Sequence, residues 1–192
     1  MGINLAEINK DWTLFIDRDG VINHEKRNDY IHTWSEFLFY DGVLDAFRIF
    51  AQTFKYIIVI TNQKGVGKGL TKLADLHTIH HNMIAAINDA GGRVDAVYFC
   101  EDVDETSPNR KPNPGMGLQA MAHFTDINTN KALMVGNTVS DMQFGRNLAV
   151  ATIFLSTTRP EVSLSHPAID KAYPTLIAFA TDLLLHTTSK VK

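Results

Sequence analysis

Five short apolar runs, separated by longer amphipathic stretches, constrain the fold of this chain more than any other feature. Each run is four or five residues long and most are rich in Val, Ile or Phe; they cover residues 12–16, 56–60, 96–99, 132–135 and 151–155. Short apolar runs bounded by polar turns are typical of strands buried on both faces, as in a parallel sheet. The runs therefore predict the strands of such a sheet.

The stretches between these runs have the spacing of amphipathic helices. In one of them Leu76, Ile79 and Met83 recur at intervals of three or four residues, and the pattern stops at Gly91, as expected for a helix C-terminus. Helices are expected over residues 43–50, 71–90, 114–124, 139–148 and 175–185. The alternation predicts an α/β protein with a three-layer Rossmann-like fold, a mainly parallel sheet and helices on both faces.

Length and charge narrow the class of protein. A chain of 192 residues is expected to form a single domain over residues 1–192. The net charge of −3, without a basic block, predicts no nucleic-acid partner and no membrane partner. The single cysteine, Cys100, excludes an intramolecular disulfide and fits a reducing compartment, and the first ten residues lack a long apolar segment. We expect a cytoplasmic protein that is a monomer or a weak dimer.

Polar residues follow four of the five apolar runs. They lie in residues 17–20, 61–63, 100–112 and 136–141. Ligands of open parallel sheets bind beyond the carboxyl ends of the strands, so these residues are the candidates for chemistry. Asp17 and Asp19 are two residues apart and can face the same side, where a divalent cation such as Mg²⁺ or a shared proton would relieve their repulsion. An acidic turn after a strand is the simpler interpretation of these two residues alone.

The sequence TNQKGVGKGL, residues 61–70, invites comparison with a nucleotide-binding P-loop. That motif requires G-x-x-x-x-G-K followed by Ser or Thr, but here Asn62 and Gly69 occupy the first and last positions. The glycines of residues 65–69 are therefore interpreted as a flexible surface loop. Thr61 and Asn62, at the end of a predicted strand, are expected to face a bound anion.

Four segments together resemble one known family. FIDRDGVIN, VITN, RKPNPGM and VGNTVSDM resemble, in order and over nearly the whole chain, the four motifs of the haloacid dehalogenase (HAD) superfamily of aspartyl-phosphate phosphatases. The details DRDG, TNQ-x-G-V and RKP-x-PGM resemble most closely its histidinol-phosphate and D,D-heptose 1,7-bisphosphate phosphatase branch.

The resemblance implies a catalytic role for four residues. Asp17 would be the nucleophile that forms an aspartyl-phosphate. Asp19 would protonate the leaving alcohol and then deprotonate water, with a pKa raised by the neighbouring carboxylate. Thr61 would bind phosphoryl oxygens, and Lys111 would neutralise phosphoryl charge and hold Asp17.

The same resemblance implies substrate and metal ligands. Asn62 and Arg110 are candidates for substrate contacts, although Arg110 and Lys111 could also be a solvated basic pair. Mg²⁺ would be bound by Asp17, by the backbone carbonyl of Asp19 and by the fourth motif. There Asn137 replaces the usual aspartate, which lowers the charge of the site. We expect Asn137 as a ligand and Asp141 in the first or second shell; an inactive binding protein is the alternative.

Zinc is a second departure from the branch, which typically carries a Cys/His zinc loop before its third motif. Here the loop begins at Cys100, Asp102 stands where a histidine is expected, and no further cysteine follows, so we predict no zinc. The histidines at 77, 80 and 81 are interpreted as a solvated helix face. His24 and His32 are candidates for substrate contacts.

The short connections leave no room for a large cap domain, so we expect an open site shaped by residues 23–34, 64–69 and 101–109. The substrate is expected to be a small phosphorylated sugar or amino alcohol. D,D-heptose 1,7-bisphosphate is the first choice and histidinol phosphate the second. A catalytically weak HAD-fold module that binds phosphorylated ligands is the alternative from another class.

Overall fold

The computed structural model describes residues 3–188 and has a six-stranded sheet at its centre. The strands are β1 (Thr13–Ile16), β2 (Tyr56–Asn62), β3 (Ala96–Cys100), β4 (Ala132–Gly136), β5 (Ala151–Leu155) and β6 (Lys171–Tyr173). Their order in the sheet is β3-β2-β1-β4-β5-β6, and every neighbouring pair is parallel. This arrangement confirms the predicted α/β fold with a parallel sheet.

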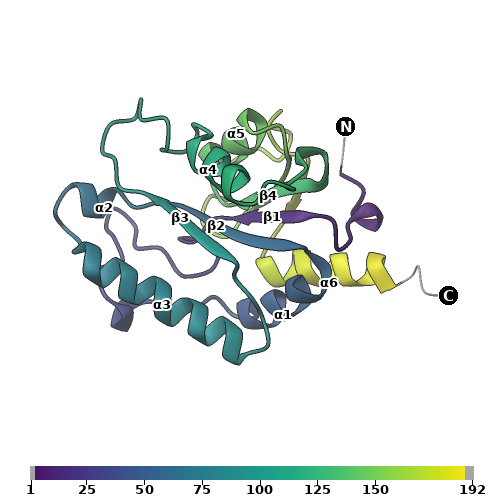
Figure 1. The fold of residues 1–192 in the computed structure, drawn as a ribbon, viewed down its shortest axis with the longest axis horizontal. Helices are drawn as coiled ribbons and strands as arrows, with labels where there is room; N and C mark the ends of the chain where they lie inside the picture. The colour runs from purple at the N-terminus through teal and green to yellow at the C-terminus, as the bar shows by residue number, and fades with distance from the viewer. Residues whose placement is uncertain (1–2, 189–192) are drawn as a thin grey trace.

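Helices cover both faces of the sheet (Figure 1). One face packs against α1 (Val43–Thr53), α3 (Leu73–Asp89) and α6 (Leu176–Thr188), the other against α4 (Gly115–His123) and α5 (Val139–Asn147). The strand period of two explains the division, because Ile57 and Val59 of β2 belong to the first core, whereas Ile58 and Ile60 belong to the second. Short 3₁₀ helices span Leu5–Glu7, Trp34–Glu36 and Thr129–Lys131.

The glycine-rich segment after β2 differs from the prediction of a flexible loop. Residues Lys64–Gly67 form the short helix α2. Gly65 is buried, and a Cβ there would lie 2.7 Å from the ring of Tyr30. A Cβ on Gly67 would lie 2.0 Å from the carbonyl oxygen of Glu101. Gly65 and Gly67 therefore allow the adjacent loops to pack closely, and the interpretation of these two residues as part of a flexible surface loop was wrong.

The edge strand β6 was also absent from the prediction. It is three residues long, half-buried, and pairs with β5 only. Such a short edge strand carries no apolar run that a sequence pattern can detect.

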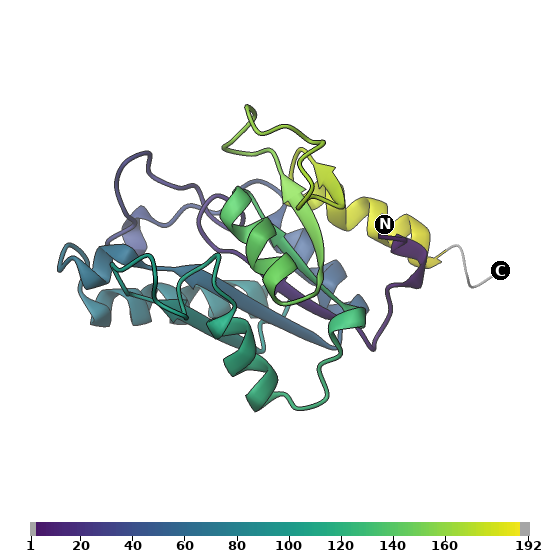
Figure 2. The same ribbon diagram turned by 90° about the horizontal axis from the view of Figure 1, so that it is seen from above.

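The topology places β1 between β2 and β4, where successive connections leave in opposite directions. Ile16, the last residue of β1, is in register with Val59 of β2 and Val135 of β4. Figure 2 shows the loop after β1 and the loop after β3 at the same end of the sheet. A ligand crevice is expected at such a switch point. Among the described residues no helix is long and apolar enough to cross a membrane.

Candidate active site

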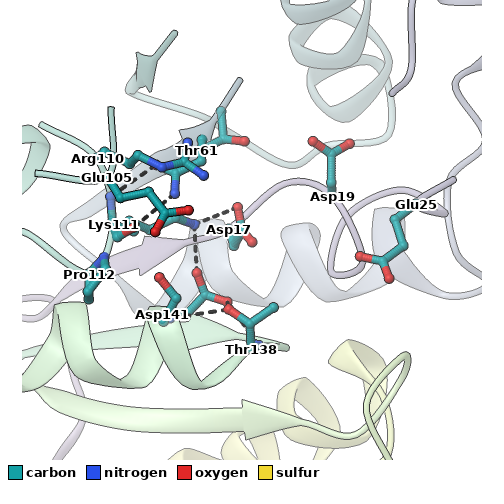
Figure 3. A pocket seen from close by; sticks show the side chains of 12 residues that line it. Asp17, Asp19, Glu25, Thr61, Glu105, Arg110, Lys111, Pro112, Thr138 and Asp141 are labelled. Carbon is teal, nitrogen blue, oxygen red and sulfur yellow. Dashed lines mark hydrogen bonds and ion pairs between the residues drawn. The ribbon is translucent and has the colours of Figure 1, made fainter. Parts of the chain in front are cut away.

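Lys111 joins the ends of β1 and β2 to the first turn of α5. Its ammonium group lies 2.8 Å from Asp17 Oδ1 and 2.6 Å from Asp141 Oδ1 (Figure 3). It also donates a hydrogen bond to the carbonyl oxygen of Ile60 at 2.9 Å. Its three N–H donors therefore match three acceptors. The side chain is only 3% exposed. The interpretation of Lys111 as part of a solvated basic pair was wrong.

The charges in this cluster shift one another's pKa values. Burial, and after it the charge of Asp141, raises the pKa of Asp17 to about 7, although Lys111 acts in the opposite direction. Burial by itself disfavours the Lys111 ammonium, but the two carboxylates raise its pKa. The Lys111 ammonium therefore keeps its charge, whereas the pKa of the Asp17 carboxyl is close to neutral pH.

Asp141 belongs to the first turn of α5. Its Oδ2 accepts hydrogen bonds from the backbone N–H of Thr138 at 3.0 Å and from the Thr138 hydroxyl at 2.7 Å, which makes a capping box. Its Oδ1 is the oxygen that binds Lys111. Both oxygens of Asp141 are thus engaged, in holding the helix end and the cation.

Asp19 lies in different surroundings. Arg18 Nη2 is 2.8 Å from both of its oxygens, and the amides of Asn23 and Gln63 donate to it at 2.9 Å. Burial alone would raise the pKa of Asp19, but Arg18, Asn23 and Gln63 together lower it. The expectation of a raised pKa for Asp19 was wrong, because Arg18 and the two amides outweigh the effect of burial.

One of the three clustered histidines lies inside the protein. His80 is 6% exposed and its Nε2 lies 3.0 Å from Arg18 Nη1, whereas His77 and His81 are exposed. The interpretation of a solvated helix face was therefore wrong for His80. Its spacing four residues after Leu76 would have placed it on the buried stripe of α3.

The end of β2 provides Thr61 and Asn62. Thr61 is buried, and its hydroxyl accepts a hydrogen bond from the Gln63 amide at 2.9 Å. Asn62 exchanges two hydrogen bonds with the backbone of Lys111, at 3.0 and 3.1 Å. Asn62 thus fixes the turn that carries the cation, and its contact with substrate stays a prediction.

A pocket of about 450 Å³ opens over these residues. Asp17, Asp19, Thr61 and Lys111 line it together with residues of the surrounding loops: Glu25, Asn62, Glu105, Arg110, Pro112, Thr138, Ser140 and Asp141. The structure therefore brings the four predicted catalytic residues to the pocket surface, together with Asn62, Arg110 and Asp141. Asn137 does not line the pocket and is fully buried.

Several side chains of the site escaped the sequence reasoning. Arg18 and Gln63 hold Asp19, and Arg159 holds Glu25 through a contact of 2.6 Å. Arg18 and Gln63 are next to predicted site residues in the sequence, and this position could have indicated that they belong to the site. Arg159 lies four residues after the end of β5, and the residues that follow this strand were not predicted to belong to the site. His24 and His32 do not line this pocket: His24 packs against Tyr40, with ring centroids 3.8 Å apart, and His32 is hydrogen-bonded to Thr71.

Asn137 is the residue that tests whether the site suits Mg²⁺. Its Oδ1 is buried and has no hydrogen-bond partner among the described residues, while its Nδ2 donates to the Thr158 hydroxyl at 2.6 Å. A Cβ at Gly20, which has a φ of +83°, would lie 2.1 Å from Asn137 Nδ2, so only glycine admits this amide beside the Asp19–Gly20 backbone. A buried amide oxygen without a hydrogen-bond donor fits a hard cation.

The loop after β3 contains the position at which zinc was considered. Asp102 Oδ2 accepts hydrogen bonds from Ser107 and, at 3.5 Å, from the Cys100 thiol. Within residues 3–188 no three His, Cys, Asp or Glu side chains form a group that could hold a metal ion. The absence of zinc stays a prediction. A magnesium site at the pocket would therefore use Asp17, Asn137 and a backbone carbonyl as ligands.

Solved structures share this fold over most of the chain. D,D-heptose 1,7-bisphosphate phosphatase from B. bronchiseptica, complexed with magnesium and phosphate, is similar with a TM-score of 0.82 and 27% identity, over 92% of this chain and 99% of that one. The enzyme from Burkholderia thailandensis gives a TM-score of 0.65 and 26% identity, over 90% and 98%. Fold and site thus define a HAD-type phosphatase, a phosphoric monoester hydrolase.

The sequence comparisons specify the family. The model of the family described as polynucleotide kinase 3 phosphatase matches residues 5–173. D-glycero-α-D-manno-heptose-1,7-bisphosphate 7-phosphatases are similar: that of Mycobacterium tuberculosis is 31% identical over 88% of this chain and 90% of its own, and that of Burkholderia mallei 36% over 78% and 82%. The chain belongs to the D,D-heptose 1,7-bisphosphate phosphatase family of HAD-like phosphatases.

Proposed function

We propose that this protein is a magnesium-dependent D,D-heptose 1,7-bisphosphate 7-phosphatase that works through an aspartyl-phosphate on Asp17. The observation that carries the proposal is the buried Lys111, whose ammonium joins Asp17 and Asp141 at the edge of the sheet. A cation fixed in this way binds a phosphoryl group without moving during the reaction. The expected catalytic residues Asp19 and Thr61 line the same pocket.

In the first step an Asp17 carboxylate oxygen attacks phosphorus, and the bond from phosphorus to the ester oxygen breaks. The leaving alkoxide takes a proton from Asp19, Thr61 binds the phosphoryl oxygens, and the positive charge of Lys111 neutralises phosphoryl charge. In the second step water attacks the aspartyl-phosphate, Asp19 accepts its proton, and inorganic phosphate leaves. Asp17 and Asp19 are then restored to their starting states.

The metal site is assigned to Asp17, the backbone carbonyl of Asp19, and Asn137. Asp17 Oδ1 is occupied by Lys111 and by the backbone N–H of Arg18, at 2.8 and 2.7 Å, which leaves Oδ2 for an ion. Both oxygens of Asp141 have other partners, so we assign it to Lys111. Bound Mg²⁺ supplies positive charge that favours ionised Asp17 and polarises the phosphoryl oxygen.

The pocket walls support a sugar bisphosphate as the substrate. Arg110 supplies a cation for a second phosphate, and Glu25 and Glu105 supply carboxylates that accept hydrogen bonds from sugar hydroxyls. The contact from Arg159 holds Glu25 in place. The named relatives act on α- and β-anomers of the heptose bisphosphate, so both anomers belong in the test.

The test measures phosphate release from both anomers of D-glycero-D-manno-heptose 1,7-bisphosphate and from histidinol phosphate, with and without Mg²⁺. We expect release from a heptose bisphosphate, dependent on Mg²⁺ and lost by at least about a thousandfold in Asp17→Asn. No release from a broad panel of phosphate esters would overturn the enzymatic assignment. A preference of about tenfold or more for histidinol phosphate would overturn the substrate.

A further inference from the structure

Arg18 is the largest of the fully buried side chains, although it carries a charge and lies between the two aspartates of the first motif. Its side chain is 1% exposed. A buried guanidinium requires acceptors for its donors, since an unpaired buried charge is strongly destabilising. Its partners therefore reveal what the residue does.

The two edges of the Arg18 guanidinium have different partners. Nε and Nη2 donate to Asp19, at 3.2 Å and 2.8 Å, in a forked arrangement. Nη1 lies 3.0 Å from Nε2 of His80, which comes from α3. Arg18 thus lies between a carboxylate at the pocket and an imidazole in the core. Three different elements, the end of β1, α3 and the turn at Gln63, fix the direction of the Asp19 carboxylate.

The hydrogen bond from Arg18 determines the tautomer of His80. A guanidinium only donates, so His80 Nε2 must accept, and the proton of the neutral ring is on Nδ1. The ring packs near Phe99, with centroids 5.7 Å apart. Burial, and then the positive charge of Arg18, lowers the pKa of His80 to about 3. His80 is accordingly a permanent acceptor at neutral pH.

We propose that His80 is a positioning residue for Asp19 and acts through Arg18, which it locks from the side opposite the carboxylate. The inference rests on the proposed function, in which Asp19 protonates the leaving alcohol. An acid that delivers a proton to one ester oxygen must be held in one direction. Without the His80 acceptor, one edge of the guanidinium is unpaired, and the fork that orients Asp19 is no longer fixed.

The test exploits the dependence of acid catalysis on the leaving group. An alkyl phosphate releases a basic alkoxide and needs the proton, whereas p-nitrophenyl phosphate releases a stable phenolate and does not. The value of kcat/KM reports the step that expels the alcohol. We expect His80→Leu to lower kcat/KM about tenfold or more for the alkyl phosphate that the wild type hydrolyses fastest, and less than about threefold for p-nitrophenyl phosphate.

Two controls separate positioning from general damage to the fold. His80→Gln keeps an acceptor and should recover most of the loss for the alkyl phosphate. His81→Leu changes an exposed neighbour on the same helix and should leave both substrates unaffected. If His80→Leu does not fold, His80→Phe, which keeps a planar ring without an acceptor, takes its place in the same comparison.

Equal losses for the two substrates, or no loss in His80→Leu, would overturn the inference. A second measurement does not depend on turnover: the ¹⁵N spectrum of labelled histidines should show His80 with a bare Nε2 and a protonated Nδ1. A proton on Nε2 would also overturn the inference. A wild type without activity on any phosphate ester would overturn the proposed function itself.

Discussion

Asp17 lies against Lys111, which also binds Asp141, whereas Asp19, two residues further along the chain, lies against Arg18, Asn23 and Gln63. Asp17 is buried and close to a second carboxylate, and its pKa is raised to about 7. Asp19 is partly exposed, with 28% of its side-chain surface accessible, and its pKa is lowered by Arg18 and the two amides. Two carboxyl groups of one short motif therefore have opposite tendencies to ionise.

The proposed roles require the reverse order, because the nucleophile must be ionised and the acid protonated. A divalent cation at Asp17 stabilises its carboxylate, and a phosphate dianion next to Asp19 favours its protonated form. The protein's own charges therefore favour the opposite order of ionisation. We expect Mg²⁺ and the substrate phosphate to supply the charges that set the order required for reaction.

The largest effect on stability is expected when Lys111, the cation that binds Asp17, is replaced. Lys111→Met leaves Asp17 and Asp141 buried without their shared partner, and we expect a loss of about 3–5 kcal/mol in the free energy of unfolding, measured with urea at pH 7. The matched control is Lys131→Met, which breaks the exposed pair with Asp11 at 2.8 Å and should cost far less, because exposed ion pairs are screened by solvent. Equal losses would show that the buried cluster contributes no special stability.

Replacement by asparagine should change the free energy of unfolding in opposite directions at Asp17 and at Asp19. Asp19→Asn removes the charge that pairs with buried Arg18 and should destabilise the metal-free protein by about 2 kcal/mol. Asp17→Asn removes a group that ionises more easily in the unfolded chain, and should stabilise it by about 1 kcal/mol at pH 7.5.

The gain in Asp17→Asn should depend on pH. The folded pKa of Asp17 is above its unfolded value, so ionisation makes the folded wild type relatively less stable as the pH rises from about 4 to 7. The advantage of the variant should therefore shrink toward pH 4. Thermal unfolding in EDTA at both pH values measures it. The same sign for both aspartates at pH 7.5 would contradict the comparison.

The pH dependence of stability tests the environment of His80, which contacts Asp19 through Arg18. The pKa of His80 falls from an ordinary 6.5 to about 3 on folding, so the unfolded chain binds more protons between these values and stability declines as the pH falls below 6.5. Relative to His80→Gln, the wild type should lose about 2 kcal/mol between pH 7 and pH 5. His81→Gln is the exposed control. Parallel pH profiles of wild type and His80→Gln would show that His80 titrates normally.

The smallest effect is expected at Asn137. Asn137→Asp adds a charge at the proposed metal site and should tighten Mg²⁺ binding about tenfold, or about 1.4 kcal/mol, measured by calorimetry. Thr158→Val, made without a change at Asn137, should weaken Mg²⁺ binding, because the Thr158 hydroxyl fixes the direction of the Asn137 amide through a hydrogen bond of 2.6 Å. In Asn137→Asp the same change should matter less, because either carboxylate oxygen can bind. Unchanged affinity in Asn137→Asp would contradict the assignment.

The sequence determined the layout of the site because the strands are short, apolar and parallel. Each run located a strand end to within two residues; β2, for example, continues through Thr61 to Asn62. Since parallel strands end at one edge, Asp17 and Asp141 had to approach one another. The family resemblance then named Lys111 as the cation, and the structure places it between these two carboxylates.

Only the tertiary structure decided the surroundings of each charge. His80 had the spacing of a buried residue but the polarity of a surface residue, and its partner Arg18 is 62 residues away in the sequence. Arg18 reversed the expected pKa shift of Asp19, and Thr158, in the loop after β5, turned the amide of Asn137. A pattern along the chain gives the chemical type of a side chain and the face it occupies. Burial and the distance to a partner charge, which set its pKa, exist only once the chain has folded.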